Sequence, residues 1–339
     1  MPDDADGAAQ RARGLLQGLQ ADPRRADLVR SLHFLPLDGA TIAGLLPLLR
    51  QVPLADDASP LLPWVRSDWE WVGGDRDLAC RLARRALDDP DEGGGLPQVL
   101  LIGAPKSGTT SLLAYLQVFP ELWRHPRKEL HFLDGRWAWG EDWYRLQFPS
   151  PGRLQGRLAM EATPDYLQDP QAPERAAALM PEARLIVLLR EPLRRALSWF
   201  QHRQRSLGVG EEAEQLISAE LHQLERLGPE QRALLGWRSP NCLAGSLYVD
   251  QIKRWLRCYQ EHQILVLRFE DLVMDPAATC QRVGRFLGLP PRELTLEHRQ
   301  NLGQAWNVAP DPYPPLSSRL AGQCRRTVLR DALQLWQQI

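Results

Sequence analysis

The chain has 339 residues, of which 44% are hydrophobic and 24% are charged, and its formal net charge is −1. This size and composition are typical of a globular protein with a sizeable core, and the balanced charge gives no indication of a nucleic-acid partner. Five cysteines without a C-x-x-C pair argue against a disulfide framework or a zinc site and favour a reducing compartment.

The beginning of the sequence, MPDDADGAAQ, is acidic and contains no apolar segment of the kind found in signal peptides. No apolar run in the chain reaches the roughly 18 residues that are needed to cross a membrane. We therefore expect a cytoplasmic protein without a membrane span.

Residues 8–90 are expected to be helical. The stretch DWEWVGGDRDLACRLARRALDDP has apolar residues at helical spacing, with Gly73 and Gly74 as a turn. It resembles one tetratricopeptide-type helix pair, although no clean period of about 34 residues is present, and a helical cap on the main domain is the alternative. A linker at 88–98 then divides the chain into a helical region, 1–95, which offers a surface for a protein partner, and a second domain, 96–339.

After the linker, apolar strands alternate with amphipathic helices. The expected strands are QVLLIG, RLAM, ARLIVLL and QILVLRF, at residues 98–103, 157–160, 183–189 and 263–269. The first leads into a helix through Phe119, and Asp275 and Gly288 bracket the helix that follows the last strand. This alternation predicts an α/β fold in which a P-loop-like, doubly wound and mainly parallel sheet is flanked by helices.

The turn after the first strand, GAPKSGTT at 103–110, has the composition of an anion site. A strand, a glycine-containing turn and a helix bring backbone N–H groups and the positive end of a helix dipole to one point, which suits phosphate. The hydroxyl groups of Ser107, Thr109 and Thr110 add further donors. The alternative is a tight strand-to-helix turn with a solvated lysine.

This turn is not a Walker A loop, G-x-x-x-x-G-K-[ST]. Gly103 and Gly108 have the required spacing, but Thr109 stands where the lysine belongs, and the lysine of this loop is Lys106. No apolar strand ending in an obvious magnesium-binding aspartate follows, since the strand LIVLL runs into Arg190. We therefore expect Lys106 to reach a bridging oxygen of a nucleotide without a metal ion.

Two segments resemble the cofactor site of sulfotransferases that use 3′-phosphoadenylyl sulfate (PAPS). GAPKSGTTSL resembles their 5′-phosphosulfate loop, and VLLREPLRRALSWFQH resembles their 3′-phosphate site, where an arginine ends a strand and a serine follows eight residues later. An arginine at the carboxyl end of a strand can fork onto a phosphate. The resemblance implies that PAPS and its product PAP bind to Lys106, Ser107, Gly108, Thr109, Thr110, Arg190 and Ser198.

Three further segments resemble the glycan-type branch of this family, which includes the heparan sulfate sulfotransferases. They are KELHFLDG, MEATPDYL and RFEDLVMDPAATCQRVGRFLGL, at 128–135, 160–167 and 268–289. The first resemblance implies that Glu129 is the catalytic base. His131, two residues on in an expected extended segment, should point to the same side and bind the acceptor or assist, and Asp134 is a weaker candidate because a loop aspartate often forms a turn.

The sequence departs from the glycan-type pattern in two places. Ala162 stands where the family has the lysine of E-K-[ST]-P, which removes one contact to substrate or sulfate. Residues 309–311 replace the K-G-R of the loop that closes over PAPS, Tyr313 and Pro314 are kept, and the paired cysteines are absent. Trp306 stands where an aromatic residue flanks the cofactor, and it is expected either to stack on adenine or to belong to the core.

The resemblance implies an enzyme that transfers a sulfuryl group from PAPS to a hydroxyl or amine by in-line displacement. Lys106 would stabilise the departing phosphate oxygen, Glu129 would take the proton of the acceptor, and no metal would be required. Two other classes stay open. One is a P-loop kinase or NTPase that acts on a small molecule, and the other is a non-enzymatic interaction protein with a decayed nucleotide site.

The acceptor is expected to be a carbohydrate or another hydroxylated molecule. The stretch WRHPRKELHF contains four basic residues that would line a cleft for an anionic acceptor, namely Arg124, His125, Arg127 and Lys128. Four tryptophans would be available to stack on sugars, namely Trp123, Trp137, Trp139 and Trp143.

Overall fold

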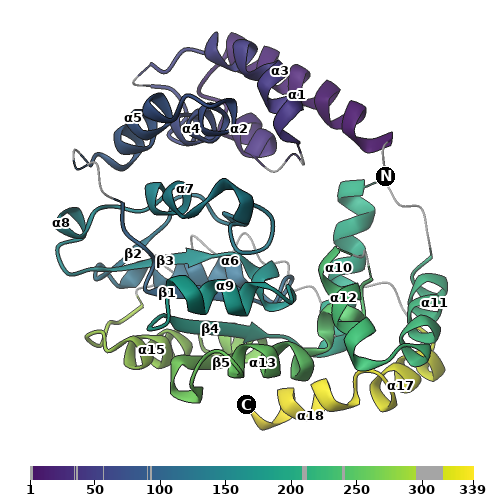
Figure 1. Ribbon diagram of the computed structural model, residues 1–339. Helices are drawn as coiled ribbons and strands as arrows, with labels where there is room; N and C mark the ends of the chain where they lie inside the picture. The colour runs from purple at the N-terminus through teal and green to yellow at the C-terminus, as the bar shows by residue number, and fades with distance from the viewer. Residues whose placement is uncertain are drawn as a thin grey trace. The chain divides into compact units, whose positions relative to one another are not determined.

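The structure is a computed structural model that describes residues 3–33, 35, 37–55, 57–89, 91, 94–207, 212–238, 241–294 and 316–339. The chain forms two compact units (Figure 1). The first contains Met1–Leu96 together with Trp137–Gly156, and the second contains Pro97–Arg136 and Arg157–Ile339. A segment that follows the first strand of the second unit therefore packs with the N-terminal helices.

All regular structure among the described residues of the first unit is helical. Its elements are α1 (Asp3–Ala21), α2 (Ala26–His33), α3 (Gly39–Arg50), α4 (Leu62–Gly73), α5 (Arg76–Leu87), η2 (Trp137–Trp139), α7 (Glu141–Leu146) and α8 (Pro151–Leu154). The expected Gly73–Gly74 turn is confirmed, because Gly74 adopts φ 94° as the residue that ends α4. The apolar faces of α1 to α4 meet in one core that includes Leu16, Leu45 and Trp69.

The segment 137–156 is attached to these helices by buried polar contacts. Trp143 is fully buried and its Nε1 donates to Asp68 Oδ1 at 3.0 Å, and Trp71 Nε1 donates to the carbonyl of Trp139 at 3.0 Å. Trp139 in turn packs edge-on against Trp143, with ring centroids 4.8 Å apart. The expectation that Trp143 is available to stack on a sugar is therefore wrong, because its ring belongs to a core.

The second unit contains a five-stranded parallel sheet with the order β2-β3-β1-β4-β5. Its strands are β1 (Val99–Gly103), β2 (Leu122–Arg124), β3 (Leu158–Ala162), β4 (Arg184–Leu189) and β5 (Ile264–Arg268). All five residues of β1 and the last five of β4 are buried, as expected for parallel strands with both faces covered. The predicted α/β fold is confirmed, and β2 is the strand that the sequence did not reveal.

Helices and short turns surround this sheet. They are α6 (Thr109–Tyr115), η1 (Leu116–Val118), η3 (Pro164–Leu167), α9 (Ala172–Leu179), α10 (Pro192–Leu207), α11 (Ala213–Arg226), α12 (Pro229–Arg238), η4 (Ala244–Ser246), α13 (Tyr248–Leu256), η5 (Glu261–Gln263), α14 (Phe269–Met274), α15 (Pro276–Leu287), α17 (Ser318–Arg326) and α18 (Arg330–Gln338). One core packs α6 and α15 on the sheet through Leu112, Ile186 and Val283. Another joins α10, α11 and α17. None of the helices in the described part of the chain is long and apolar enough to cross a membrane.

The expected helix boundaries follow the capping residues. Asp275 begins α15 by accepting a hydrogen bond from the Ala278 N–H at 2.9 Å, and Gly288 ends it with φ 68°. The helix after β1 was expected to continue through Phe119, but it ends at Tyr115 and tightens into the 3-10 turn η1. Such tightening is common in the last turn of a helix, because it satisfies terminal carbonyl groups.

Candidate active site

The candidate residues lie at one edge of the sheet. Because all five strands are parallel, their carboxyl ends meet at the same edge, and ligands bind there in open α/β sheets. The segments that follow β1, β2, β3 and β4 carry Lys106, Glu129, Asp165 and Arg190 respectively. Four segments far apart in the sequence thus supply charged groups to one region of the second unit.

The loop after β1 has the backbone of an anion site. Gly103 lets this strand approach η3 closely, since a Cβ atom at this position would lie 2.5 Å from Leu167 Cβ. Lys106 and Gly108 both adopt left-handed φ angles, 66° and 87°. In the first turn of α6, the Ser111 N–H donates to the Gly108 carbonyl at 3.0 Å, whereas the N–H groups of Thr109 and Thr110 come too early in the helix to reach an acceptor within it, which suits them to a ligand.

The expected hydroxyl donors of this loop differ in exposure. Ser107 is fully buried and Thr109 is 4% exposed, whereas Thr110 is exposed. Their role in cofactor binding stays a prediction.

The expected 3′-phosphate residue, Arg190, is attached to the same loop. Its Nη1 donates to the carbonyl of Lys106 at 3.3 Å, and its guanidinium lies 4.4 Å from the centroid of the Phe269 ring. The Tyr248 hydroxyl donates to the Arg190 carbonyl at 2.9 Å. The ends of β1 and β4 are therefore held together, as a site for one nucleotide requires. Ser198 lies half-buried on α10.

Tyr248 supports the backbone of Arg190 in the candidate site, and the sequence did not indicate this role. Burial raises the pKa of Tyr248 to about 12, so its hydroxyl stays protonated and acts as a donor at neutral pH. No motif marks this residue, because its position depends on how α13 packs beside the sheet.

The segment that carries Glu129 is attached to β3. The Glu129 N–H donates to the carbonyl of Ala162 at 2.9 Å, and the Phe132 N–H donates to the Tyr166 hydroxyl at 2.9 Å. Tyr166 donates in turn to the buried carboxylate of Glu161 at 2.8 Å, and Thr163 Oγ1 donates to the same oxygen at 2.6 Å. This network orients the Glu129 segment.

Glu129 and His131 do point to the same side, but the segment between them is not extended. Their φ angles are 69° and 54°, both left-handed. Glu129 Oε2 lies 3.9 Å from His131 Nε2, and Glu129 Oε1 forms an ion pair with Lys128 Nζ. Both side chains, Glu129 and His131, are 27% exposed and can therefore meet a ligand.

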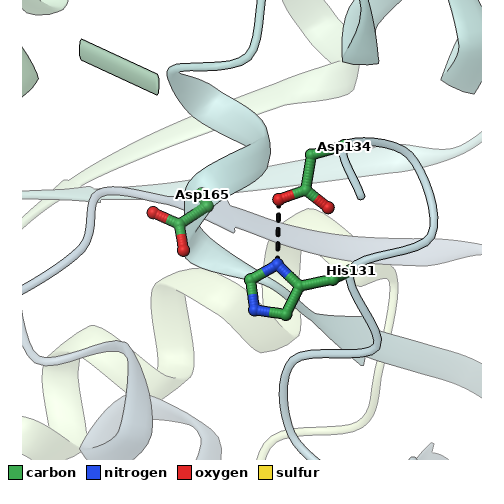
Figure 2. Close-up of side chains that lie close together, drawn as sticks. All are labelled: His131, Asp134 and Asp165. Carbon is green, nitrogen blue, oxygen red and sulfur yellow. Dashed lines mark hydrogen bonds and ion pairs between the residues drawn. The ribbon is translucent and has the colours of Figure 1, made fainter. Parts of the chain in front are cut away.

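His131 lies between carboxylates (Figure 2). Its Nδ1 is 2.8 Å from Asp134 Oδ2, and Asp165 approaches the imidazole from η3. Asp134 also accepts a hydrogen bond from the Gly135 N–H through Oδ1 at 2.8 Å, so it forms a turn as well as a partner for His131. Asp165 was not among the predicted residues. The sequence does carry a signal that could have found it, because Asp165 is a charged residue in the turn between an apolar strand and Tyr166.

The surroundings of His131 favour its charged form. Burial alone would lower the pKa of His131, but the hydrogen bond and charge of Asp134, with the charges of Asp165 and Glu129, raise it to about 8. Burial raises the pKa of Asp165 to about 6, against the opposing charge of His131. Ligand atoms of His131, Asp134 and Asp165 lie within 4.8 Å of one another, a set that could hold a metal ion. The His131–Asp134 pair already satisfies these charges, so we interpret the set as an ion-pair cluster.

The protonated His131 should make the stability of the chain depend on pH. Since the pKa in the folded state is raised above the usual 6.5 to about 8, this contribution is fully present below about pH 6.5 and is lost as the pH rises through about 8. The free energy of unfolding should fall by about 1–2 kcal/mol between about pH 6 and about pH 9. Urea unfolding at the two pH values measures this difference in the free energy of unfolding.

The control for this pH effect is His262, an exposed histidine of η5. His131→Asn should flatten the pH dependence, whereas His262→Asn should leave it as in the wild type. Equal stability of the wild type at both pH values would contradict the assignment.

The expected basic cleft around residues 124–128 is wrong for two of its four members, His125 and Arg127, because both are buried. The His125 N–H donates to the Met160 carbonyl at 3.0 Å, which continues the pairing of β2 with β3 and directs the segment into the protein. His125 and Arg127 are 4% and 3% exposed, and Arg124 Nη1 donates to the Leu113 carbonyl at 3.2 Å. Trp123 packs edge-on against His125. Trp306, residues 309–311, Tyr313 and Pro314 lie outside the described residues.

Left-handed backbone angles single out three of the candidate residues. Within the described residues, five residues other than glycine have such angles, and two of them, Asp88 and Gln155, end helices α5 and α8. The remaining three are Lys106, Glu129 and His131. Each conformation of this kind costs about 1–3 kcal/mol and persists where surrounding contacts hold it, typically at functional sites.

The geometry is that of an α/β protein in which the glycine-containing loop of Lys106, the guanidinium of Arg190 and a carboxylate–histidine cluster lie at the same sheet edge. The model of the sulfotransferase domain matches residues 96–303, more than half of the chain. The chain therefore belongs to the sulfotransferase domain family, which confirms the resemblance found in its motifs.

Curated relatives are similar to part of the chain. The human bifunctional heparan sulfate N-deacetylase/N-sulfotransferase 3 is 33% identical over 202 residues, which cover 58% of this chain and 23% of the relative. The mouse bifunctional heparan sulfate N-deacetylase/N-sulfotransferase 2 is 30% identical over 250 residues, which cover 72% of this chain and 27% of the relative. The chain thus matches about a quarter of the length of these relatives. Among solved structures, a sulfotransferase from Alicyclobacillus acidocaldarius is 23% identical with a TM-score of 0.49, covering 72% of this chain and 99% of that one.

Proposed function

We propose that this chain transfers a sulfuryl group from PAPS to a hydroxyl or amine group of an acceptor. The observation that carries the proposal is the left-handed backbone of three residues, other than glycine, that do not end a helix. Two of these three residues, Lys106 and Glu129, are the ones to which the sulfotransferase motifs imply a catalytic role, and the third, His131, is the one expected to bind the acceptor or assist. Membership of the sulfotransferase domain family supports it further.

The residues at the sheet edge fit PAPS. Two half-buried cations, Lys106 and Arg190, lie on adjoining segments, and the Arg190 guanidinium donates to the backbone carbonyl of Lys106. This arrangement suits a ligand with phosphates on two positions. The N–H groups of the loop and the first turn of α6 would hold the 5′-phosphate. Arg190 and Ser198 would hold the 3′-phosphate. When bound, PAPS supplies a sulfuryl group activated by a phosphate leaving group.

The side chains divide the chemistry between them. The Lys106 ammonium would neutralise the charge that develops on the departing phosphate oxygen, so no divalent metal is needed. The Glu129 carboxylate would accept the proton of the acceptor as the bond to sulfur forms. His131 is an unsuitable base because it is protonated at neutral pH, and its Nε2–H would instead donate a hydrogen bond to the acceptor.

We further propose a carbohydrate acceptor, because two relatives are named for heparan sulfate. The burial of His125 and Arg127 leaves less positive charge beside Glu129 than the sequence suggested. The cytoplasmic location, the division at residues 95 and 96 and a protein partner for the N-terminal helices stay predictions.

PAP should bind much more tightly than ATP, because ATP lacks the 3′-phosphate that Arg190 would hold. A charge-assisted contact contributes about 1.5–3 kcal/mol, so Arg190→Ala should weaken PAP binding by about 10- to 100-fold and change ATP binding little. Titration calorimetry measures both affinities.

Arg184 provides the matched control, since it lies at the opposite end of the same strand and is exposed. Arg184→Ala should leave the affinity for PAP unchanged. Equal affinity for PAP and ATP, or wild-type PAP affinity in Arg190→Ala, would refute the assignment and favour a kinase or NTPase.

A further inference from the structure

Lysine is rare in this chain, and two of its three lysines lie in the candidate site. Of 41 basic residues, only Lys106, Lys128 and Lys253 are lysines. Lys253 is exposed on α13, whereas Lys128 is directly beside Glu129. A compact ammonium group therefore lies next to the candidate base in a chain whose basic residues are mostly arginine.

The contact between Lys128 and Glu129 depends on an uncommon backbone. Neighbouring side chains of an extended segment point to opposite sides, so they do not meet. The left-handed φ of Glu129 brings the two side chains together, and Lys128 Nζ forms an ion pair with Glu129 Oε1. The side chains of Lys128 and Glu129 are only 20% and 27% exposed, so solvent screens this pair less than one at the surface.

The two oxygens of Glu129 have different neighbours. Oε1 is engaged by Lys128, and Oε2 lies 3.9 Å from His131 Nε2, too far for a hydrogen bond. Attraction between the Glu129 carboxylate and a protonated His131 would close this gap if nothing held the carboxylate elsewhere. Oε2 would then be occupied and unable to take a proton from an acceptor.

We propose that Lys128 is a positioning residue for Glu129. By holding Oε1, Lys128 keeps Oε2 separate from His131 and open to the acceptor. The inference rests on the proposed function, in which Glu129 is the base. It assigns different roles to the two oxygens of one carboxylate, Oε1 as the anchored atom and Oε2 as the proton acceptor.

A double-mutant cycle tests whether Lys128 acts through Glu129. PAP release from PAPS is measured with an oligosaccharide of unsubstituted glucosamine as acceptor and with water alone, for the wild type, Lys128→Met, Glu129→Gln and the double variant. Lys128→Met should lower kcat by about tenfold or more, but should have little further effect once Glu129 is glutamine, because coupled residues are not additive. The affinity for PAP should stay within about threefold, since Lys128 lies in the segment after β2 and not in the loop after β1.

Two further variants separate positioning from a general loss of structure. Lys128→Arg restores the charge and should recover much of the lost turnover, and Lys253→Met removes a lysine away from the site and should match the wild type. Unchanged turnover in Lys128→Met, or additive losses in the double variant, would overturn the inference while leaving the proposed function in place. A wild type that releases no PAP under either condition would overturn both.

Discussion

Replacing Glu129 by glutamine is expected to lower kcat by about 10²–10⁴-fold, because the change keeps the size of the side chain and removes the proton acceptor. The affinity for PAP should stay within about threefold, since Glu129 lies after β2 and not in the loop after β1. Steady-state kinetics of PAP release, together with calorimetry of PAP binding, measure the two quantities separately.

The matched control for this variant is Glu261→Gln, which changes an exposed glutamate of η5 in the same way. Its turnover should equal that of the wild type. Near-normal turnover in Glu129→Gln would mean that Glu129 is structural. His131→Asn, measured across a range of pH under otherwise the same conditions, would then show whether turnover follows the deprotonated His131, as a base requires, or its protonated form.

Replacing Lys106 by alanine should damage both binding and turnover. The ammonium group would contact the phosphate in the ground state and gain importance as negative charge develops on the leaving oxygen. We expect kcat to fall by about 10²–10³-fold, the size of effect found when one transition-state donor is removed, and PAP affinity to fall by about tenfold or more.

Lys253→Ala serves as the control for Lys106→Ala, because it removes the same charge from an exposed position on α13. A Lys106→Ala variant with wild-type PAP affinity and wild-type kcat would show that the lysine of this loop is merely solvated. That outcome would revive the interpretation of residues 103–110 as a simple strand-to-helix turn.

Much of the second unit could be predicted because its signals are local. The strands β1, β3, β4 and β5 are apolar runs bounded by turn residues, and α15 is framed by the capping residues Asp275 and Gly288. β2 escaped prediction because its three residues are too few to establish a pattern, and it is defined by pairing with β3.

The part of the candidate site whose residues belong to linear sequence motifs was predictable. Lys106, Arg190 and Glu129 stand at fixed positions in such motifs, and the parallel sheet brings them to one edge. The pairing of Lys128 with Glu129 was not predictable, since it requires a left-handed backbone at a non-glycine residue. The partners of His131 depend on how η3 packs against the segment after β2.

The wrong expectations about acceptor-binding residues share one physical cause, which is that residue type does not reveal burial. Arg127 and His125 are basic but face the protein interior, because their segment continues the pairing of β2. Trp143 has the ring that sugars stack on, but its N–H is satisfied by Asp68 within the helical unit. Exposure had to come from the tertiary structure.

The most direct test of the account is a transfer experiment with the full chain. The protein is incubated with PAPS in a buffer that contains EDTA, together with a panel of hydroxylated and amine-bearing carbohydrates, and the products are followed by mass spectrometry. The account predicts a sulfated acceptor and an equal amount of PAP, without any requirement for a divalent metal. No sulfated product on any acceptor, with phosphorylated product formed from ATP and magnesium instead, would contradict it.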